Sequence, residues 1–389
     1  MPEPTPAAIS PDTVTAFLVG ACDVEIWGMS GIERAERMVR RAGIADVAIG
    51  GSEIDEGRTA LIVRTDMVID EALARALMAR PGVLLAVERA EGLKPVAAHV
   101  ARDAIDVGGA VVRGETVDRQ AAEARGLTVL SPVELAGSYN SALRKKATPF
   151  VLELTEKTAR EIERATFEAS YKGVTDFVTK WIWPPVALPL TRYLARRGAT
   201  PNAVTLASFA CVLAAVALFA TGHFLAGALF GWLMALLDTV DGKLARVTLT
   251  SSKWGNVFDH GIDLVAPPFW WLAWWYGLDG RGEPALVQAM WIMVGGYVAG
   301  KLLEQAFISS FGIKTHVWQP IDSAFRQVTA RRNPNLAILT LGALAGAPAA
   351  GYLAAAGWMV ICFCFHAVRL GQAFIQKRNG AAITSWLES

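Results

Sequence analysis

Cysteine and net charge are both scarce in this sequence. The four cysteines among 389 residues, Cys22, Cys211, Cys362 and Cys364, have the spacing of neither a disulfide framework nor a zinc site. Lysine and arginine outnumber the acidic residues by only 37 to 36, which argues against a binder of nucleic acid or other polyanions. The first residues, MPEPTPAAISPDT, lack a basic stretch followed by an apolar run. No signal peptide is therefore evident, and we expect the amino terminus to lie in the cytoplasm.

Apolar residues are abundant instead. Hydrophobic residues make up 53% of the chain and include 13 tryptophans, as is typical of an integral membrane protein. The long apolar runs lie after residue 200, and their lengths predict six membrane-spanning helices, the last two joined by a short turn near Gly357. The expected spans are 203–221, 224–240, 260–278, 286–307, 336–354 and 356–375.

Basic residues gather in every second connection of this predicted bundle. Lys243 and Arg246 follow the second span, Lys314, Arg326 and Arg331 follow the fourth, and Lys377 follows the sixth. The positive-inside rule places these connections in the cytoplasm, together with both termini. We therefore expect an integral protein of an inner, cytoplasmic-type membrane.

Residues 13–147, ahead of the spans, alternate short apolar runs with helical patterns. The expected strands are TAFLVG, DVAIG, TALIVRTD, VLLAVE, GAVVRG and LTVLS. The expected helices between them are ERAERMVRRAGI, EALARALMARP and VDRQAAEARG. Such alternation predicts a soluble α/β domain with a mostly parallel sheet.

The chain is thus expected to have three parts. They are an α/β domain at 1–147, a charged helical connector at 148–180 and an all-α membrane domain at 181–389. Residues 176–197 mix tryptophan, proline and apolar residues with a basic end. This composition predicts a juxtamembrane amphipathic helix that lies on the lipid surface.

Four aspartates recur in the stretch DTVDGKLARVTLTSSKWGNVFDHGID, residues 238–263. Asp238 and Asp241 stand three residues apart at the end of one apolar helix, and Asp259 and Asp263 stand four apart at the start of the next. Each pair therefore shares a helical face. The connection between the helices lets them turn back on each other, which would bring both acidic faces together.

Four converging carboxylates require compensation. Two such charges about 4 Å apart repel by about 4 kcal/mol at an effective dielectric constant near 20, so the cluster needs protons, water or cations. Oxygen ligands without cysteine or histidine favour Mg²⁺, Mn²⁺ or Ca²⁺ over zinc. Two divalent ions could neutralise all four acids and hold a phosphate between them.

The spacing D-x2-D-G-x2-A-R-x8-G-x3-D-x3-D resembles the signature of the CDP-alcohol phosphotransferase (CDP-alcohol phosphatidyltransferase) family, and all eight of its positions are matched. The resemblance implies transfer of a phospho-alcohol group from a CDP-alcohol to an acceptor alcohol, with release of CMP. It also implies a homodimer and two Mg²⁺ or Mn²⁺ ions. The implied metal ligands are Asp238, Asp241, Asp259 and Asp263, and Asp263 would also be the base that accepts the proton of the incoming alcohol.

The remaining motif residues would lie near the nucleotide. Gly242, Ala245 and Gly255 are small, and glycine permits a close approach of the backbone. Arg246 would pair with the phosphates, as a planar guanidinium does well; it could also be a charge that only sets topology.

Ionisable residues inside the predicted spans are candidates for an acceptor pocket. Lys301 and Glu304 lie one turn apart in the fourth span, and His366 and Arg369 lie one turn apart in the sixth. Lys301 and Arg369 could grip an acceptor phosphate. They could equally be internal pairs or reach to the lipid headgroups.

The first domain resembles the nucleotidyltransferases. The stretch GMSGIERAERMVRRAGIADVAIG resembles their first helix and second strand, and LIVRTDMVID resembles their strand that ends in a metal-binding acid, here Asp66. The whole layout is similar to the bifunctional inositol-phosphate cytidylyltransferase and di-myo-inositol-phosphate-phosphate synthase type. However, no glycine-rich, basic loop follows the first strand. We therefore expect a degenerate domain, with Asp66 an ordinary strand-end acid. The donor could be CDP-diacylglycerol or a soluble CDP-alcohol such as CDP-inositol, in phospholipid or phosphodiester headgroup synthesis.

Two other functions fit the acidic motif less well. A cation transporter would place its acids near mid-membrane, often in internal repeats, whereas these acids lie at one edge and no repeat is visible. A catalytically dead scaffold is disfavoured because all eight motif positions are present. Membrane lipids, a CDP-alcohol and an acceptor alcohol are the expected partners, and nucleic acid is not.

Overall fold

The structure, a computed structural model, describes residues 13–50, 57–114, 118–137, 139–140, 143–251 and 253–388. Within these ranges the side chains of residues 139, 140, 253, 254, 256–260 and 263 are not described. The chain forms two compact units. The first takes in the described residues up to Asn140 together with Lys146–Ser170 and Arg246–Thr250, and the second takes in the rest.

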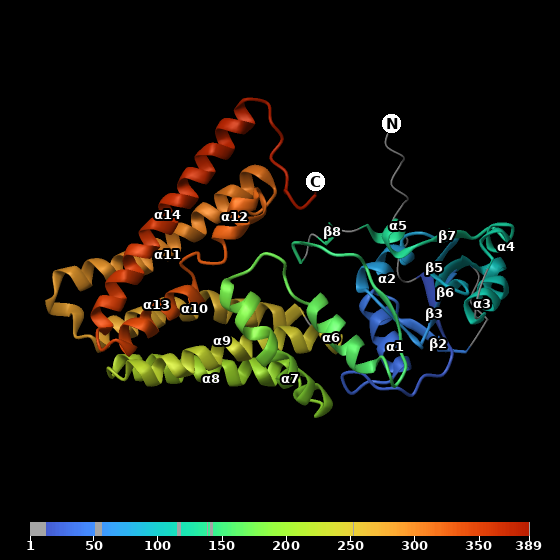
Figure 1. Ribbon diagram of the computed structural model, residues 1–389, viewed down its shortest axis with the longest axis horizontal. Coiled ribbons are helices and arrows are strands. Elements are labelled where there is room, and N and C mark those ends of the chain that lie inside the picture. Colours follow the sequence, from blue (N-terminus) through green and yellow to red (C-terminus); the bar gives the residue numbers. More distant parts are fainter. Residues whose placement is uncertain are drawn as a thin grey trace. The chain divides into compact units, whose positions relative to one another are not determined.

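A six-stranded sheet forms the centre of the first unit (Figure 1). The strand order is β2-β1-β3-β6-β5-β7. β1 pairs in parallel with β2 and β3, β5 pairs in parallel with β7, and β6 runs antiparallel to both β3 and β5. The predicted α/β domain with a mostly parallel sheet is confirmed. The strands are β1 (Val14–Val19), β2 (Asp46–Ile49), β3 (Thr59–Arg64), β5 (Val83–Arg89), β6 (Gly92–Ala101) and β7 (Thr128–Leu130).

Helices cover both faces of this sheet because its central strands are apolar on both sides. In β1, Ala16 and Leu18 face the cluster that contains α1 and α2, whereas Phe17 and Val19 face the cluster that contains α3 and α4. Such two-sided burial is the reason the parallel strands read as unbroken apolar runs. The helices are α1 (Gly31–Arg41), α2 (Glu71–Met78), α3 (Ile105–Arg113), α4 (Arg119–Glu123) and α5 (Pro132–Ala136).

Two predictions for this region are wrong. The run GAVVRG, predicted as a strand, lies at the end of α3, and the long strand β6 was not predicted. Short apolar runs do not distinguish a buried strand from a buried helix. α3 is apolar because it packs closely on β6, where a Cβ on Gly108 would lie 2.8 Å from the Val100 side chain.

The predicted connector is not helical throughout. Its residues Val151–Glu153 form β10, which pairs antiparallel with β4 (Met67–Ile69). Helix α6 (Ala159–Ala169) follows and also belongs to the first unit. The strand escaped prediction because its partner is more than eighty residues earlier in the chain.

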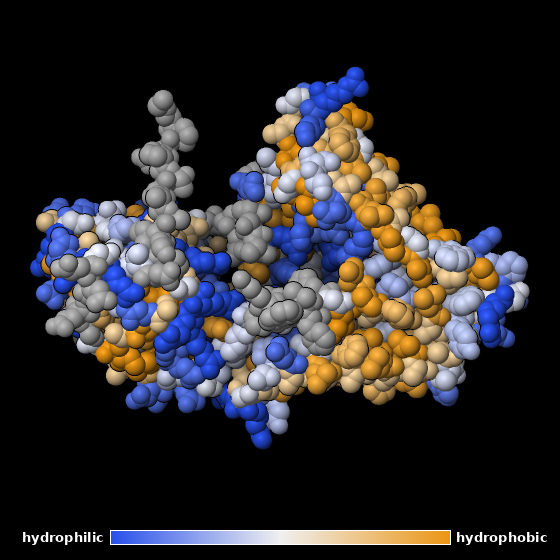
Figure 2. Space-filling view, turned by 180° about the vertical axis from the view of Figure 1, so that it is seen from behind, coloured by the Kyte–Doolittle hydropathy of each residue, from blue (hydrophilic) through white to orange (hydrophobic). Residues whose placement is uncertain are grey.

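The second unit is helical. Four of its described helices, α8, α9, α11 and α14, are long and apolar enough to cross a membrane, and hydrophobic residues cover much of the visible surface over the helices (Figure 2). The predicted count of six spans is not confirmed. The helices of this unit are α7 (Trp183–Arg196), α8 (Pro201–Ala220), α9 (Phe224–Val247), α10 (Lys253–Gly277), α11 (Pro284–Phe311), α12 (Pro320–Phe325), α13 (Arg332–Leu344) and α14 (Pro348–Arg378).

The turn predicted near Gly357 is wrong. Gly357 lies within α14, which runs unbroken from Pro348 to Arg378, and the chain reverses just before it. Gly346 there has φ = 70°, a conformation that glycine adopts without strain. Pro348 then opens the next helix. This Gly-Ala-Pro sequence marks the break better than Gly357 does.

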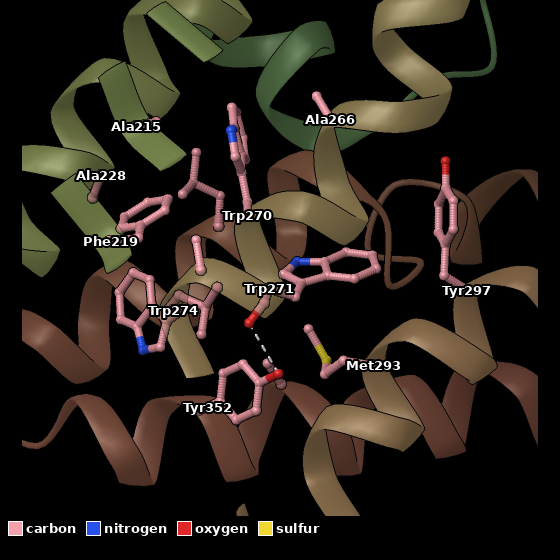
Figure 3. Close-up of a cluster of buried hydrophobic side chains, with 14 of the residues drawn as sticks. Ala215, Phe219, Ala228, Ala266, Trp270, Trp271, Trp274, Met293, Tyr297 and Tyr352 are labelled. Carbon is pink, nitrogen blue, oxygen red and sulfur yellow. Dashed lines mark hydrogen bonds between the residues drawn. The ribbon is translucent and has the colours of Figure 1, made fainter. Parts of the chain in front are cut away.

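A cluster of tryptophans on α10 holds the helices together (Figure 3). Trp274 lies against Phe219 of α8 and Phe224 of α9, with ring centroids 4.8 and 4.7 Å away. Trp271 meets Tyr297 of α11 edge to face at 5.3 Å. Its carbonyl also accepts a 3.1 Å hydrogen bond from the Tyr352 hydroxyl of α14. α10 is therefore tied to four other helices of the unit.

The close packing of α13 on α14 gives a test of the corrected turn. A Cβ on Gly342 would lie 2.5 Å from the Cα of Gly351, whereas a Cβ on Gly357 would meet no described atom within 4 Å. Gly342→Ala should therefore lower the midpoint of thermal unfolding in detergent, at a cost of about 1–3 kcal/mol. Gly357→Ala should leave the midpoint unchanged or raise it, since alanine favours a helix interior. Equal losses from both substitutions would contradict this hairpin.

Candidate active site

Asp238 and Asp241 lie on adjacent turns at the end of α9, and both are held by other helices. Oδ2 of Asp238 accepts a 2.7 Å hydrogen bond from Nη2 of Arg332, the first residue of α13. Oδ2 of Asp241 accepts a 2.7 Å hydrogen bond from the Thr205 hydroxyl of α8. Asp241 is only 3% exposed. The first half of the motif is thus a pair of oriented, mostly buried carboxylates.

The second half of the motif lies on α10. The side chains of Asp259 and Asp263 are outside the described residues, so the convergence of all four acids remains a prediction. In the part of the chain that the structure describes, no three His, Cys, Asp or Glu side chains form a metal-binding group. The donor chemistry of the motif still suits Mg²⁺ or Mn²⁺, because its ligands would all be carboxylate oxygens.

The small motif residues lie on these same two helices. Gly242 and Ala245 are on the last turns of α9, and Gly255 is on the first turn of α10. Arg246 donates a 3.3 Å hydrogen bond to the carbonyl of Ser170 at the end of α6. Whether these residues contact a nucleotide stays a prediction.

A cavity opens in the helical unit among α11, α14 and the connection between α11 and α13, which contains α12. It encloses about 650 Å³ of empty space, open solvent included. Lys301 and Glu304 of α11 line it, as does His366 of α14. The connection adds Thr315, His316, Arg326 and Arg331.

The charge of this cavity is predominantly positive. Glu304 is the acid in the lining, and its carboxylate lies 2.5 Å from Arg331 and 3.9 Å from Lys301. His316 is neutral at pH 7, because burial and then the surrounding cations, first Arg144, hold its pKa well below the usual value. The lining is therefore suited to an anion.

Arg326 is the unusual member of this lining. Its Nε and Nη1 atoms are buried and meet no hydrogen-bond acceptor among the described residues. Burial, and then the charge of Arg331, lower the pKa of Arg326 to about 9. The cation is thus less stable here than in water, and an anion bound in the cavity would stabilise it.

The two residues predicted to grip an acceptor have different surroundings. Lys301 lines the cavity, whereas Arg369 is not among the described residues of the lining. The Arg369 guanidinium binds both carboxylate oxygens of buried Asp322, at 2.6 and 2.8 Å, and also reaches Gln319 at 2.6 Å. Arg369 therefore anchors α12, which ends beside Arg326.

The charge pattern of the sequence predicts only that Arg326 and Arg331 help to set the membrane topology, and it predicts no role for His316. The three lie in a connection between predicted spans, where a basic residue is ordinary. A signal was nevertheless available, since this connection carries several basic residues and also a histidine.

In the first unit, a helix covers the described loop at the place where a nucleotide would be expected. Ligands of parallel sheets bind beyond the carboxyl ends of the strands, and the loop after β1 begins there. Trp27 of this loop is 1% exposed. Its backbone N–H donates to Glu163 at 3.1 Å and its indole N–H donates to Thr166 at 2.9 Å, both on α6. Helix α6 therefore covers this loop.

Asp66, the candidate metal ligand of that unit, forms an ion pair. Arg64 donates two hydrogen bonds to its carboxylate, at 2.9 and 2.7 Å, and these bonds lower the pKa of Asp66. The backbone carbonyl of Asp66 accepts from Leu154, next to β10. This geometry is that of an ordinary strand-end acid.

The position of Arg369 leads to a stability prediction. Arg369→Met should lower the thermal midpoint in detergent strongly, because it leaves Asp322 buried without its cation, a loss of about 3–5 kcal/mol. Asp322→Asn in the same chain should restore part of the loss. Arg378→Met, at the exposed end of α14, is the control. If Arg369→Met unfolds like the wild type but weakens acceptor binding, Arg369 contacts the acceptor directly.

The comparisons with known proteins concern the helical unit. A family model described as CDP-alcohol phosphatidyltransferase matches residues 199–330, which include all eight motif positions. The phosphatidylinositol phosphate synthase of Mycobacteroides abscessus is 40% identical over 104 residues, 26% of this chain and 47% of that protein. The bifunctional IPC transferase and DIPP synthase of Rubrobacter xylanophilus is 31% identical over 164 residues, 40% of this chain and 33% of that protein.

The chain thus spans about half the length, or less, of these curated relatives. Among solved structures, the phosphatidylinositol phosphate synthase of Mycobacterium tuberculosis with CDP-DAG bound is 23% identical. That match covers 48% of this chain and 94% of the other, with a TM-score of 0.39. The same enzyme has a structure with manganese and citrate. The resemblance predicted from the aspartate spacing is confirmed: residues 199–330 of this chain match the model of the CDP-alcohol phosphatidyltransferase domain.

Proposed function

We propose that this protein transfers a phosphatidyl group from CDP-diacylglycerol to a phosphate-bearing polyol at a membrane surface, with release of CMP. The observation that carries the choice of acceptor is the cationic cavity, in which two buried N–H groups of Arg326 meet no acceptor among the described residues. The names of several relatives, phosphatidylinositol phosphate synthases, support an inositol phosphate as that polyol.

The start of α13 links the cavity to the motif. Arg331 and Arg332 are consecutive residues; Arg331 pairs with Glu304 in the cavity, and Arg332 pairs with Asp238 of the motif. An acceptor held in the cavity would thus lie within the same group of helices as the carboxylates that handle the donor. This adjacency favours direct transfer between two bound substrates.

The proposed reaction is a displacement at phosphorus. A hydroxyl oxygen of the polyol attacks the β-phosphorus of the CDP-alcohol, and the bond from that phosphorus to the oxygen bridging to the α-phosphate breaks. CMP departs with the bridging oxygen, and Asp263 accepts the proton of the hydroxyl. Arg246 would pair with the phosphates of the nucleotide.

Divalent metal ions fit the donor side of this site. Asp238, Asp241, Asp259 and Asp263 would hold two Mg²⁺ or Mn²⁺ ions, which when bound would neutralise charge on the pyrophosphate and on the departing CMP. The contacts of Arg332 and Thr205 orient the two described carboxylates, as second-shell groups commonly do for metal ligands.

The cavity would recognise the acceptor by its phosphate. Lys301, Arg326 and Arg331 can donate charge-assisted hydrogen bonds, which are stronger than neutral ones. A dianionic phosphate would supply the acceptor that Arg326 needs and would balance the excess positive charge. An uncharged polyol would do neither, so its binding should be much weaker.

A soluble donor is the second candidate. The match to a bifunctional IPC transferase and DIPP synthase favours it, because such a pathway would use a water-soluble CDP-alcohol made by a fused domain. The covered loop of the first unit and the ion-paired Asp66 argue against a nucleotidyl-transfer site there. A homodimer with its active site on the cytoplasmic side remains a prediction of the family resemblance and of the charge pattern.

The central test is CMP release by the purified full-length protein in detergent with Mg²⁺. We expect release with CDP-diacylglycerol plus an inositol phosphate, and a loss of at least 100-fold in Asp241→Asn and Asp263→Asn, as is usual for metal or base ligands. Asp279→Asn, in an exposed loop, should retain activity. Release only with CDP-inositol would support the second candidate, and undiminished release by Asp263→Asn would refute its role as base.

Arg326 tests the acceptor assignment. Arg326→Gln should raise KM for the phosphorylated acceptor about 10- to 100-fold, the range expected for one or two charged hydrogen bonds. KM for the CDP-alcohol should stay within twofold of the wild-type value. Arg281→Gln, whose side chain is exposed, is the matched control. A wild-type enzyme that uses the free polyol as well as its phosphate would contradict the assignment.

A further inference from the structure

The chain after α14 returns to the loop that forms one wall of the cationic cavity. We call residues 383–387 the tail segment and residues 315–326 the cavity wall. In Figure 1 the red end of the chain runs back toward α12, and hydrogen bonds connect the two. The side chains of Ser385 and Leu387 are buried in this position, so the tail segment is part of the packed structure.

Among the described residues, three hydrogen bonds join the tail segment to the cavity wall. The Ser385 hydroxyl donates to the Val317 carbonyl at 3.0 Å, and the backbone N–H of Trp386 donates to the same carbonyl at 3.2 Å. The indole N–H of Trp386 donates to the Ser323 hydroxyl at 2.9 Å. Ser323 in turn donates to the His316 carbonyl at 2.7 Å.

These bonds converge on the residues next to the cavity lining. Thr315 and His316, which line the cavity, directly precede Val317. Ser323 lies on α12, one turn before Arg326. The chain of bonds from Trp386 through Ser323 to His316 therefore spans the wall from its first turn to its last helix.

The opposite side of the wall is held independently. Arg369 of α14 binds Asp322 of α12 and Gln319, the N-cap residue of that helix. Lys301 and Glu304, by contrast, project from the long helix α11. The tail segment and α14 thus both contact the wall, which faces cavity residues on the long helix α11.

We propose that the tail segment positions the cavity wall for binding of the acceptor phosphate, with Trp386 and Ser385 as positioning residues. The inference rests on the proposed function of the cavity. Several donors must converge on one phosphate, and such convergence requires that each be held within about 0.5 Å of its place. Without the tail bonds, His316 and Arg326 would sample a wider range of positions relative to Lys301, and acceptor binding would weaken.

Trp386→Phe is the primary variant, because it removes the indole N–H and keeps an aromatic ring. We expect KM for the phosphorylated acceptor to rise about 3- to 10-fold, the effect of one hydrogen bond, with KM for the CDP-alcohol and kcat within twofold of the wild-type values. Ser323→Ala should raise the acceptor KM at least as much. The double variant should match Ser323→Ala alone, since both remove the same bond.

Trp291→Phe is the matched control, because Trp291 lies on α11 and is 65% exposed. It should alter no kinetic parameter. A Trp386→Phe enzyme with an unchanged acceptor KM would overturn the proposal. So would parallel losses in kcat and in both KM values, because these would indicate a general loss of structure.

A binding measurement separates this proposal from the proposed function. Affinity for inorganic phosphate, measured by calorimetry on the full-length protein, should fall about 3- to 10-fold in Trp386→Phe but not in Trp291→Phe. If the wild type binds phosphate more tightly than Trp386→Phe but releases no CMP with any donor, the proposed function fails and the positioning role stands. Equal phosphate affinity in the wild type and Trp386→Phe overturns the positioning role, whatever the activity.

Discussion

A charged side chain buried away from water must be paired with an opposite charge or with a ligand, and this constraint determines how the helices of the second unit contact one another. Three of its arginines each meet a carboxylate from another helix. Arg326 differs, because two of its buried N–H groups have no acceptor among the described residues. Pairing therefore accounts for the architecture around α13, and the exception marks the place where a ligand would complete it. The three pairs are Arg331–Glu304, Arg332–Asp238 and Arg369–Asp322.

The motif was visible in the sequence because its chemistry is local. Asp238 and Asp241 share a helical face by spacing alone, and the structure places them on consecutive turns of α9. The groups that orient them were not predictable in this way. Arg332 lies 94 residues from Asp238, and Thr205 lies 36 residues from Asp241. Such contacts depend on how helices pack, which no single periodicity reveals.

The errors in the predicted fold have the same origin. β10 pairs with β4, which lies more than eighty residues earlier, and β6 pairs with β3 across an intervening helix as well as with its neighbour β5. The local pattern alone therefore does not identify either strand. The turn between α13 and α14 was misplaced because both sides of it are apolar, and hydropathy cannot locate a break within an apolar run. Local chemistry did locate it, in the Gly346–Pro348 sequence. The same limit applies to functional sites. The charge of Arg369 within a predicted span is evident from the sequence, but its pairing with Asp322 is not.

The first unit bears on the choice of donor. A nucleotidyl-transfer domain needs an open crevice beyond its parallel strands, but the loop after β1 is bonded to α6 through Trp27. Under our proposal the first unit does not form CDP-inositol, and the membrane unit then depends on a donor from elsewhere. CDP-diacylglycerol already resides in the bilayer, where an active site at the ends of membrane-spanning helices can reach it. We propose that a lipid donor and a water-soluble phosphorylated acceptor would then meet where the start of α13 contacts both a carboxylate of α9 and the cationic cavity.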